Sequence, residues 1–151
     1  MRYTVIGMIS GTSYDAVDAA AADFELDGDE VRCYPRGLYS EPVPEDIRAR
    51  IAAALPPHAT TLEEVCRLDT EIGQLFGRIG ATANERLAGG QADFVVSHGQ
   101  TVYHWVDGAH ALGTLQLGAA AWVAEATGVA TVSDLRTRDI TRRRAAIVRR
   151  A

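Results

Sequence analysis

The sequence contains no lysine, and all fifteen of its basic residues are arginine. A Walker A nucleotide-binding loop is therefore excluded, because its chemistry requires a lysine at the phosphates. Catalysis through a lysine Schiff base is excluded for the same reason. No apolar run approaches the roughly 20 residues that a membrane-spanning helix needs, and the first residues show no secretory signal pattern. We therefore expect a cytoplasmic protein without a membrane partner.

Cysteine is scarce as well. Cys33 and Cys66 lack the spacing of a metal site, and so do three of the four histidines, His58, His104 and His110. We expect the two cysteines to be buried thiols of a reduced, cytoplasmic protein, although two cysteines leave one disulfide open.

Charge is unevenly distributed. The formal net charge is −5, but residues 142–151 contain five arginines and no acidic residue. Residues 1–141 therefore carry ten basic and 20 acidic groups, which is −10. This acidic body argues against nucleic acid as the main partner.

The N-terminal part has the pattern of three antiparallel strands. Mostly apolar stretches predict strands over 3–10, 17–26 and 31–40, and Asp27-Gly28-Asp29 predicts a hairpin turn between the last two. The alanine-rich run 19–22 would be compatible with a helix on propensity alone.

Two helices are expected next. Pro44 is typical of a first helical turn and predicts a helix over 45–55. The sequence from Thr60 to Glu63 matches a capping box and predicts a long helix that ends at Gly89-Gly90. We expect its glycines to permit close approach of a neighbouring element; they are Gly73, Gly77 and Gly80. Its predicted apolar stripe consists of Leu62, Val65, Cys66, Ile72, Leu75, Phe76, Ile79, Ala83 and Leu87.

The remaining pattern alternates strands and helices. It predicts a strand over 92–97 broken at His98-Gly99, a strand over 114–117, a helix over 119–127 and a strand over 129–133. A strand meander followed by helix-separated strands predicts one α/β domain, a mixed sheet with helices on its faces.

The turn Gly11–Asp15 is a candidate phosphate site. It offers backbone N–H groups and the hydroxyls of Thr12 and Ser13 in one turn, which suits phosphate oxygens. Asp15 and Asp18 place carboxylates nearby, where they could hold Mg²⁺ directly or through water. A solvated polar hairpin turn is the alternative, and local chemistry favours it.

Three further polar segments follow predicted strands, where ligands often bind in α/β folds. They are Ser97–Thr101, Gln116–Gly118 and Asp134–Asp139. Amides and hydroxyls there could bind sugar hydroxyls, and Arg136 and Arg138 could bind a carboxylate or phosphate. Polar strand ends and surface ion pairs are the alternatives.

Together these segments resemble the anhydro-N-acetylmuramic acid kinase family. The matching segments are Gly7–Asp18, Ser97–Thr101, Thr114–Gly118, Thr127–Val129 and Ser133–Ile140, in the family's order and with similar spacing. The resemblance covers about residues 3–140. It implies one half of an actin/hexokinase-like kinase, with a ribonuclease-H-like mixed sheet and flanking helices.

The resemblance also implies ligands. The family uses ATP and Mg²⁺ to open 1,6-anhydro-N-acetylmuramic acid with water and phosphorylate O6, in peptidoglycan recycling. Asp15 would hold Mg²⁺, directly or through water. The residues implied for the ATP phosphates are Gly11, Thr12, Ser13, Tyr14, Asp15, Ala16, Val17 and Asp18. The candidates for the sugar are His98, Gln100, Thr101, Gln116, Asp134, Arg136 and Arg138.

The sequence departs from the family in three places. Ala16 stands where the family has glycine, which matters only if φ there is positive. Ala119 stands where the family has an acidic or amide residue. After Ile140 the family's Gly-Gly-Gln-Gly-Ala-Pro-Leu segment is replaced by TRRRAAIVRRA.

The end of the match defines the expected domains. We expect a kinase domain over 1–140 and a divergent arginine-rich tail over 141–151, from a frameshifted or truncated reading frame; a native basic tail is the alternative. The family's catalytic aspartate and adenine-binding loops have no counterpart here, so no general base is assigned and turnover by this chain alone is not expected. The rival interpretations are a non-catalytic module that binds ligand or forms a homodimer, and another ATPase of the superfamily.

Overall fold

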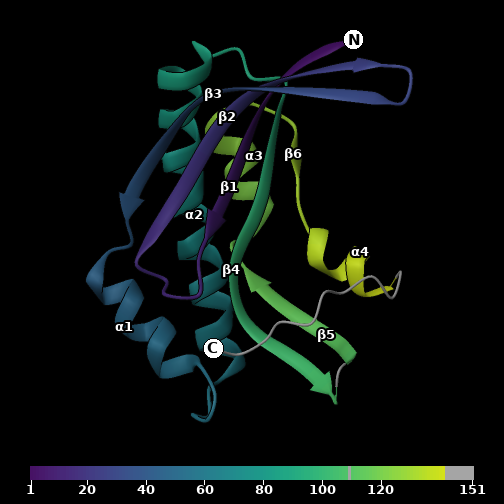
Figure 1. Ribbon diagram of the computed structural model, residues 1–151. Helices are drawn as coiled ribbons and strands as arrows, with labels where there is room; N and C mark the ends of the chain where they lie inside the picture. Colours follow the sequence, from purple (N-terminus) through teal and green to yellow (C-terminus); the bar gives the residue numbers. More distant parts are fainter. Residues whose placement is uncertain (109, 142–151) are drawn as a thin grey trace.

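The computed structural model describes residues 1–108 and 110–141, and in this part of the chain it shows a mixed α/β fold (Figure 1). The strands are β1 (Arg2–Ser10), β2 (Ala16–Asp27), β3 (Glu30–Pro42), β4 (Phe94–Asp107), β5 (His110–Leu117) and β6 (Thr131–Val132). The helices are α1 (Glu45–Ala54), α2 (Leu62–Ala88), α3 (Ala120–Thr127) and α4 (Leu135–Thr141).

The strands form one sheet in the order β3-β2-β1-β4-β5, and β6 pairs with β4. The first three strands are antiparallel, with Gly28 at φ 58° in the turn between β2 and β3. β4 runs parallel to both β1 and β6 and antiparallel to β5. The predicted meander and the predicted mixed sheet are both confirmed.

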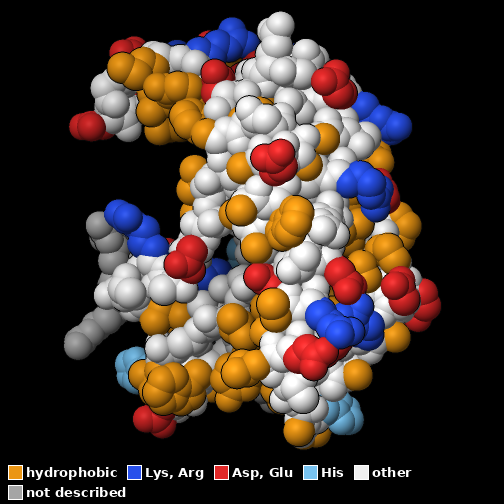
Figure 2. Space-filling model, turned by 180° about the vertical axis from the view of Figure 1, so that it is seen from behind, with side chains coloured by type: hydrophobic (Ala, Val, Ile, Leu, Met, Phe, Trp, Pro, Cys, Tyr) orange, Lys and Arg blue, Asp and Glu red, His pale blue; other side chains and the backbone are white. Residues whose placement is uncertain are grey.

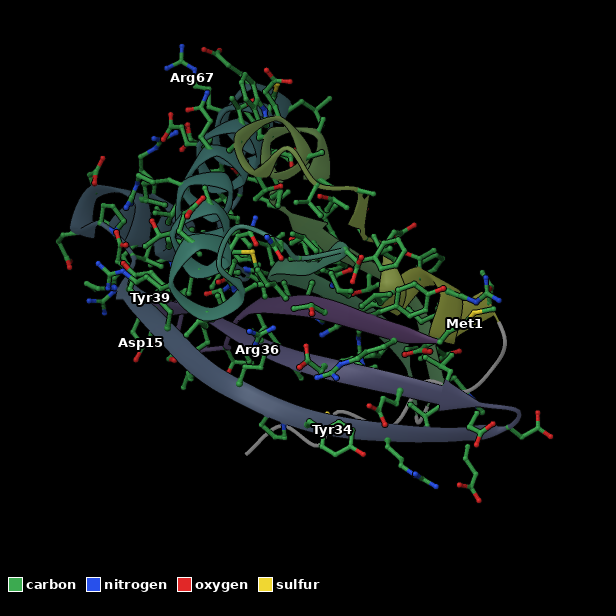
Figure 3. All side chains as sticks on the ribbon, turned by 90° about the horizontal axis from the view of Figure 1, so that it is seen from above. Met1, Asp15, Tyr34, Arg36, Tyr39 and Arg67 are labelled. Atoms are coloured by element: carbon green, nitrogen blue, oxygen red, sulfur yellow. The ribbon has the colours of Figure 1, made fainter. Side chains whose placement is uncertain are left out.

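The core lies between the sheet and the helices. Side chains that alternate along the strands point toward α2, as strand geometry requires; they include Ile6, Met8, Val17, Ala19 and Val95. Leu68, Ile72, Phe76 and Ile79 of α2 cover them. Figure 3 shows α2 and α3 together on one side of the sheet. The other side of the strands β1–β3 has no helix over it in the part of the chain that the structure describes.

Three glycines let α2 approach its neighbours closely, as predicted. A Cβ on Gly73 would lie 2.8 Å from Cδ1 of Trp122, and one on Gly77 would lie 2.7 Å from the Trp122 carbonyl oxygen. A Cβ on Gly80 would lie 3.0 Å from the sulfur of Met8. The glycines therefore set the distance of α2 from α3 and from β1.

The ends of α2 are formed by its caps. The hydroxyl of Thr61 accepts a hydrogen bond from the backbone N–H of Glu64 at 3.1 Å, one residue later than the predicted capping box. Gly89, at φ 64°, ends the helix as predicted.

The apolar stripe was wrong in the first turns of α2. Leu62 is 88% exposed and Cys66 is also exposed, whereas Leu68 is buried. The first turns of α2 extend past the core, which a helical period in the sequence does not reveal. The prediction that both cysteines are buried was wrong too, because Cys33 is an exposed free thiol on β3.

Two strand predictions also need correction. The strand predicted to break at His98-Gly99 continues as β4 to Asp107, because β5 supplies a second pairing partner beyond that point. Residues 135–141, expected only to follow a strand, form α4. Residues 142–151 of the expected arginine-rich tail lie outside the described residues.

Asp23 ties the strands β1, β2 and β3 together at one end of the sheet. Its carboxylate accepts hydrogen bonds from Arg2 at 2.9 Å and Thr4 at 2.7 Å, and it also pairs with Arg36 at 3.3 Å. These bonds, first of all the one from Arg2, lower the pKa of Asp23 to about 2.

We expect the stabilisation from Asp23 to depend on pH. Because the folded-state pKa is depressed, the stabilisation is present above the ordinary value of about 3.9 and is lost as the pH falls toward 2. Asp23→Asn should therefore lower the melting temperature at pH 6, and the difference from wild type should shrink at pH 2. Thermal unfolding across this range measures it, with Asp29→Asn in the exposed hairpin turn as the control. A pH-independent difference would contradict the role of the carboxylate.

Candidate functional site

The predicted phosphate turn joins the end of β1 to the start of β2. The backbone N–H of Tyr14 donates to the carbonyl of Gly11 at 3.1 Å, which closes a β-turn around Thr12 and Ser13. The amides of Thr12 and Ser13 make no backbone hydrogen bond within the described residues, and both residues are exposed. The turn therefore leaves two N–H groups and the hydroxyl of Thr12 as donors for an anion, while the hydroxyl of Ser13 donates to Asp15.

Asp15 follows directly. Its carboxylate accepts a hydrogen bond from the hydroxyl of Ser13 at 2.6 Å, and this bond is the main cause of a lowered pKa of Asp15. Its backbone carbonyl accepts from Val43 N–H at 2.9 Å, which anchors the turn to the end of β3. Figure 3 shows the Asp15 side chain pointing away from the helices. An exposed, ionised carboxylate beside outward N–H groups fits a Mg²⁺ ion that also binds phosphate oxygens and water.

The other residues predicted for the phosphates differ in their positions. Tyr14 has a left-handed backbone, at φ 42°. Ala16 begins β2 and has no positive φ, so the alanine in place of the family's glycine causes no strain. The side chain of Val17 is buried in the core, and Asp18 lies within β2 opposite Ile9. Among these residues, Thr12, Ser13 and Asp15 have exposed side chains in the turn.

A pocket of about 300 Å³ opens beside the end of β5 and the first half of β4. It is lined by Asp69, Ser97, His98, Gly99, Thr114, Leu115, Gln116, Leu117, Gly118, Ala119, Ala120, Ser133, Asp134 and Thr137. Segments about 65 residues apart in sequence meet there. The volume is at the lower end of the range for small-molecule sites, roughly 300–1,000 Å³.

The structure brings together only some of the predicted sugar residues. His98, Gln116 and Asp134 line the pocket, and Asp134 has a left-handed backbone at φ 59°. Thr101 does not line the pocket but contacts a residue that does. Its hydroxyl accepts a hydrogen bond from the side-chain amide of Gln116 at 3.1 Å. Gln100 is buried and faces the phosphate turn instead. Arg136 and Arg138 are on α4 and are not among the lining residues.

Asp69 is a pocket residue that sequence reasoning missed. It comes from α2, and its carboxylate accepts a hydrogen bond from Gly118 N–H at 2.8 Å, while its carbonyl accepts from Ala119 N–H at 3.3 Å. It thus supports the start of α3, whose own N-cap residue makes no side-chain bond. In the sequence Asp69 is only an acidic residue that follows an apolar one. Nothing there indicates that its carboxylate accepts a hydrogen bond from Gly118.

The pKa of His104 is sensitive to the nearby charge of Arg136. Its ring Nδ1 lies 3.0 Å from the hydroxyl of Thr114, and burial is the main cause of its lowered pKa, followed by the positive charge of Arg136. We expect Arg136→Gln to raise the pKa of His104, because a repelling cation is removed. A proton NMR titration measures this, with Arg138→Gln as the matched control. An unchanged pKa in Arg136→Gln would contradict the proximity.

Residues 1–108 and 110–141 contain no group of three or more histidine, cysteine, aspartate or glutamate side chains arranged to hold a metal. A Mg²⁺ ion at Asp15 would therefore need ligands from phosphate and water. None of the described helices is long and apolar enough to cross a membrane.

The fold and the site together define one half of an actin-like ATPase fold, a mixed sheet with a polar turn after its first strand and a pocket beside β4 and β5. The family model of anhydro-N-acetylmuramic acid kinase matches residues 3–143. The chain belongs to this family.

Relatives show how much of the family the chain spans. It is 57% identical over 136 residues to an anhydro-N-acetylmuramic acid kinase of Rhodococcus erythropolis, which covers 90% of this chain and 34% of that protein. The kinase of Streptomyces avermitilis is also 57% identical, with 35% of it covered, and that of Caldanaerobacter subterraneus is 33% identical over 143 residues, with 36% covered. The chain thus spans about a third of the length of the curated relatives it matches.

Proposed function

We propose that this chain is the N-terminal, phosphate- and sugar-binding portion of an ATP-dependent kinase for 1,6-anhydro-N-acetylmuramic acid in the cytoplasm. One observation carries the proposal: β1 ends, and the turn begins, beside the stretch of β4 that lines the pocket. Ser10, just before the turn, pairs with Gln100, three residues after the pocket residue Ser97. A phosphate donor and a sugar acceptor bound at these two places would be neighbours.

Unusual backbone conformations occur in both the turn after β1 and the pocket. Tyr14 and Asp134 are the non-glycine residues with positive φ in the described part of the chain, and one lies in the turn and the other in the pocket. Such conformations cost free energy and tend to cluster at functional sites.

The residues have distinct roles in this proposal. The amides of Thr12 and Ser13 and the hydroxyl of Thr12 would bind phosphate oxygens, and Asp15, oriented by the hydroxyl of Ser13, would hold Mg²⁺. The metal, when bound, supplies charge neutralisation for phosphoryl transfer. His98, Gln116 and Asp134 would bind and orient the sugar. O6 becomes a nucleophile only as water attacks C1, and that step needs a base, for which we assign no residue of this chain.

Calorimetry with separated ligands tests the proposal. We expect Mg·ATP and Mg·pyrophosphate to bind weakly, with dissociation constants of about 1 mM, and adenosine not to bind, because only the phosphate side of the site is proposed here. The anhydro sugar should shift NMR signals of pocket residues. Binding of adenosine alone, or no binding of either phosphate ligand, would contradict the proposal.

A turnover assay tests the assignment of the base. With the anhydro sugar, Mg²⁺ and ATP, this chain alone should release no ADP above background. Clear turnover would show that a base lies within these residues, and the pocket residues Asp69 and His98 would then be the first to substitute.

A second candidate function, a non-catalytic module that forms a homodimer, is favoured by the uncovered side of the sheet. Ile9, Leu38 and Phe94 are 45%, 65% and 36% exposed there, and Figure 1 views the molecule from this side. Figure 2 shows the helix-covered side, where acidic and basic side chains are spread among apolar ones. Sedimentation decides between the candidates: a stable monomer that binds no apolar dye would argue against the dimer.

A further inference from the structure

A bulge in β4 directs the side chain of Gln100 toward the protein interior. Met8 of β1 pairs with Ser97, but Ser10 pairs with Gln100, so β4 has one extra residue in this stretch. Gly99 lies in this bulge at φ 70°, and a Cβ there would be 2.5 Å from the carbonyl oxygen of Leu117. A bulge of this kind shifts the alternation of side chains between the two faces. As a result, Ser97 and Gln100 are both buried, although strict alternation would place them on opposite faces.

The side chain of Gln100 connects β4 to the phosphate turn. Its Nε2 donates to the carbonyl of Thr101 at 3.0 Å and reaches the carbonyl of Gly11 at 3.4 Å. The same Gly11 carbonyl accepts the bond from Tyr14 N–H that closes the turn. Gln100 and the turn's own hydrogen bond thus converge on one oxygen atom.

The packing around Gln100 is not explained by stability. Its Oε1 is buried and has no hydrogen-bond partner in the described structure, and the same holds for the hydroxyls of Ser10 and Ser97. Gln100 is only 2% exposed. Buried polar atoms without partners are destabilising, so an apolar side chain of the same shape would pack at least as well. A buried polar atom without a partner calls for an explanation other than packing, and a functional role is one of the usual ones.

We propose that Gln100 is a positioning residue, which holds the carbonyl of Gly11 and thereby orients the phosphate turn relative to the sugar pocket. It was expected to contact the sugar itself, but its burial and its direction toward Gly11 exclude it from the pocket lining. The role rests on the proposed function in one respect, namely that the turn binds phosphate. The contact to Gly11 is a property of the free protein.

The first test is spectroscopic and needs no ligand. Gln100→Met keeps the size of the side chain and removes its donor. We expect the ¹³C signal of the Gly11 carbonyl and the ¹⁵N signal of the Thr12 amide to shift, because both nuclei belong to the peptide group that accepts the bond. We also expect the melting temperature to fall by no more than about 2 °C. Gln100→Leu serves the same test if the methionine variant does not fold.

The control is a second buried amide far from the turn. Asn84 accepts a hydrogen bond from Ala92 N–H at 3.0 Å through its side-chain oxygen. Asn84→Leu should lower the melting temperature more than Gln100→Met and leave the Gly11 and Thr12 signals unchanged. Equal shifts in both variants, or no shift in Gln100→Met, would overturn the proposal.

Binding of Mg·ATP separates this proposal from the proposed function. Gln100→Met should raise the dissociation constant about fivefold, a loss typical of one hydrogen bond. If wild type binds no Mg·ATP, the proposed function fails, while the carbonyl signals still decide whether Gln100 holds the turn. If wild type binds and Gln100→Met binds equally well with shifted signals, the contact exists but does not position the turn for phosphate, and the proposal is wrong.

Discussion

Replacing Gly77 with valine is expected to lower the free energy of unfolding by about 3 kcal/mol, the upper part of the usual range for an overpacked core. A Cβ at this position would lie 2.7 Å from the carbonyl oxygen of Trp122 and 2.9 Å from the Cβ of Ala126. Both atoms belong to α3 and cannot move as a flexible side chain can. The helices α2 and α3 would therefore have to separate, which opens the core next to the pocket. Urea unfolding followed by circular dichroism measures the loss.

Gly7→Val is the matched control for this prediction. Gly7 lies in β1, and no atom lies within 4 Å of a Cβ built on it. Valine also suits a strand, so the control should keep or slightly raise the free energy of unfolding. An equal loss in both variants would show that the substitution, and not the contact between α2 and α3, is responsible.

The second large effect is expected in ligand binding. Asp15→Asn should weaken binding of Mg·ATP about tenfold, which corresponds to about 1.4 kcal/mol, and should largely remove the effect of Mg²⁺ on ATP affinity. The amide keeps the size of the side chain and loses the negative charge that a hard cation requires. The comparison uses calorimetry with ATP in the presence of Mg²⁺ and in the presence of EDTA.

The control for Asp15 keeps the overall charge change the same. Asp29→Asn, in the turn at the far end of the β2–β3 hairpin, also removes one carboxylate. It should leave the affinity for Mg·ATP unchanged. If Asp15→Asn binds Mg·ATP like wild type, Asp15 does not hold the metal and the phosphate turn acts through its N–H groups and hydroxyls alone.

Local patterns predicted the elements well where their physical causes are local. The hairpin at Gly28 and the end of α2 at Gly89 follow from left-handed backbone that glycine adopts readily. The close approach of α2 at Gly77 was also predictable, although its partner was not. Errors arose where burial depends on distant elements: Leu62 fits the helical period but lies beyond the core, and Cys33 lies on an exposed part of β3.

In the candidate site, too, the contiguous part was predicted from the sequence and the part assembled from distant elements was not. The phosphate turn is contiguous, so its donors and its carboxylate were predicted from Gly11 to Asp15. The pocket is assembled from four separate segments, and Asp69 entered it only because α2 packs beside the start of α3. The direction of Gln100 depends on a bulge that forms between β1 and β4, which no period along a single strand reveals.

By itself the sequence determined the class of fold and the family, because these rest on local backbone preferences and on short motifs that keep their order. Only the tertiary structure decided which polar residues share a pocket, which apolar residues stay exposed, and that Gln100 faces Gly11 and lies outside the pocket lining. The physical reason is that burial and hydrogen-bond partners belong to pairs of elements, and the distance between those elements in space is not encoded in either one alone.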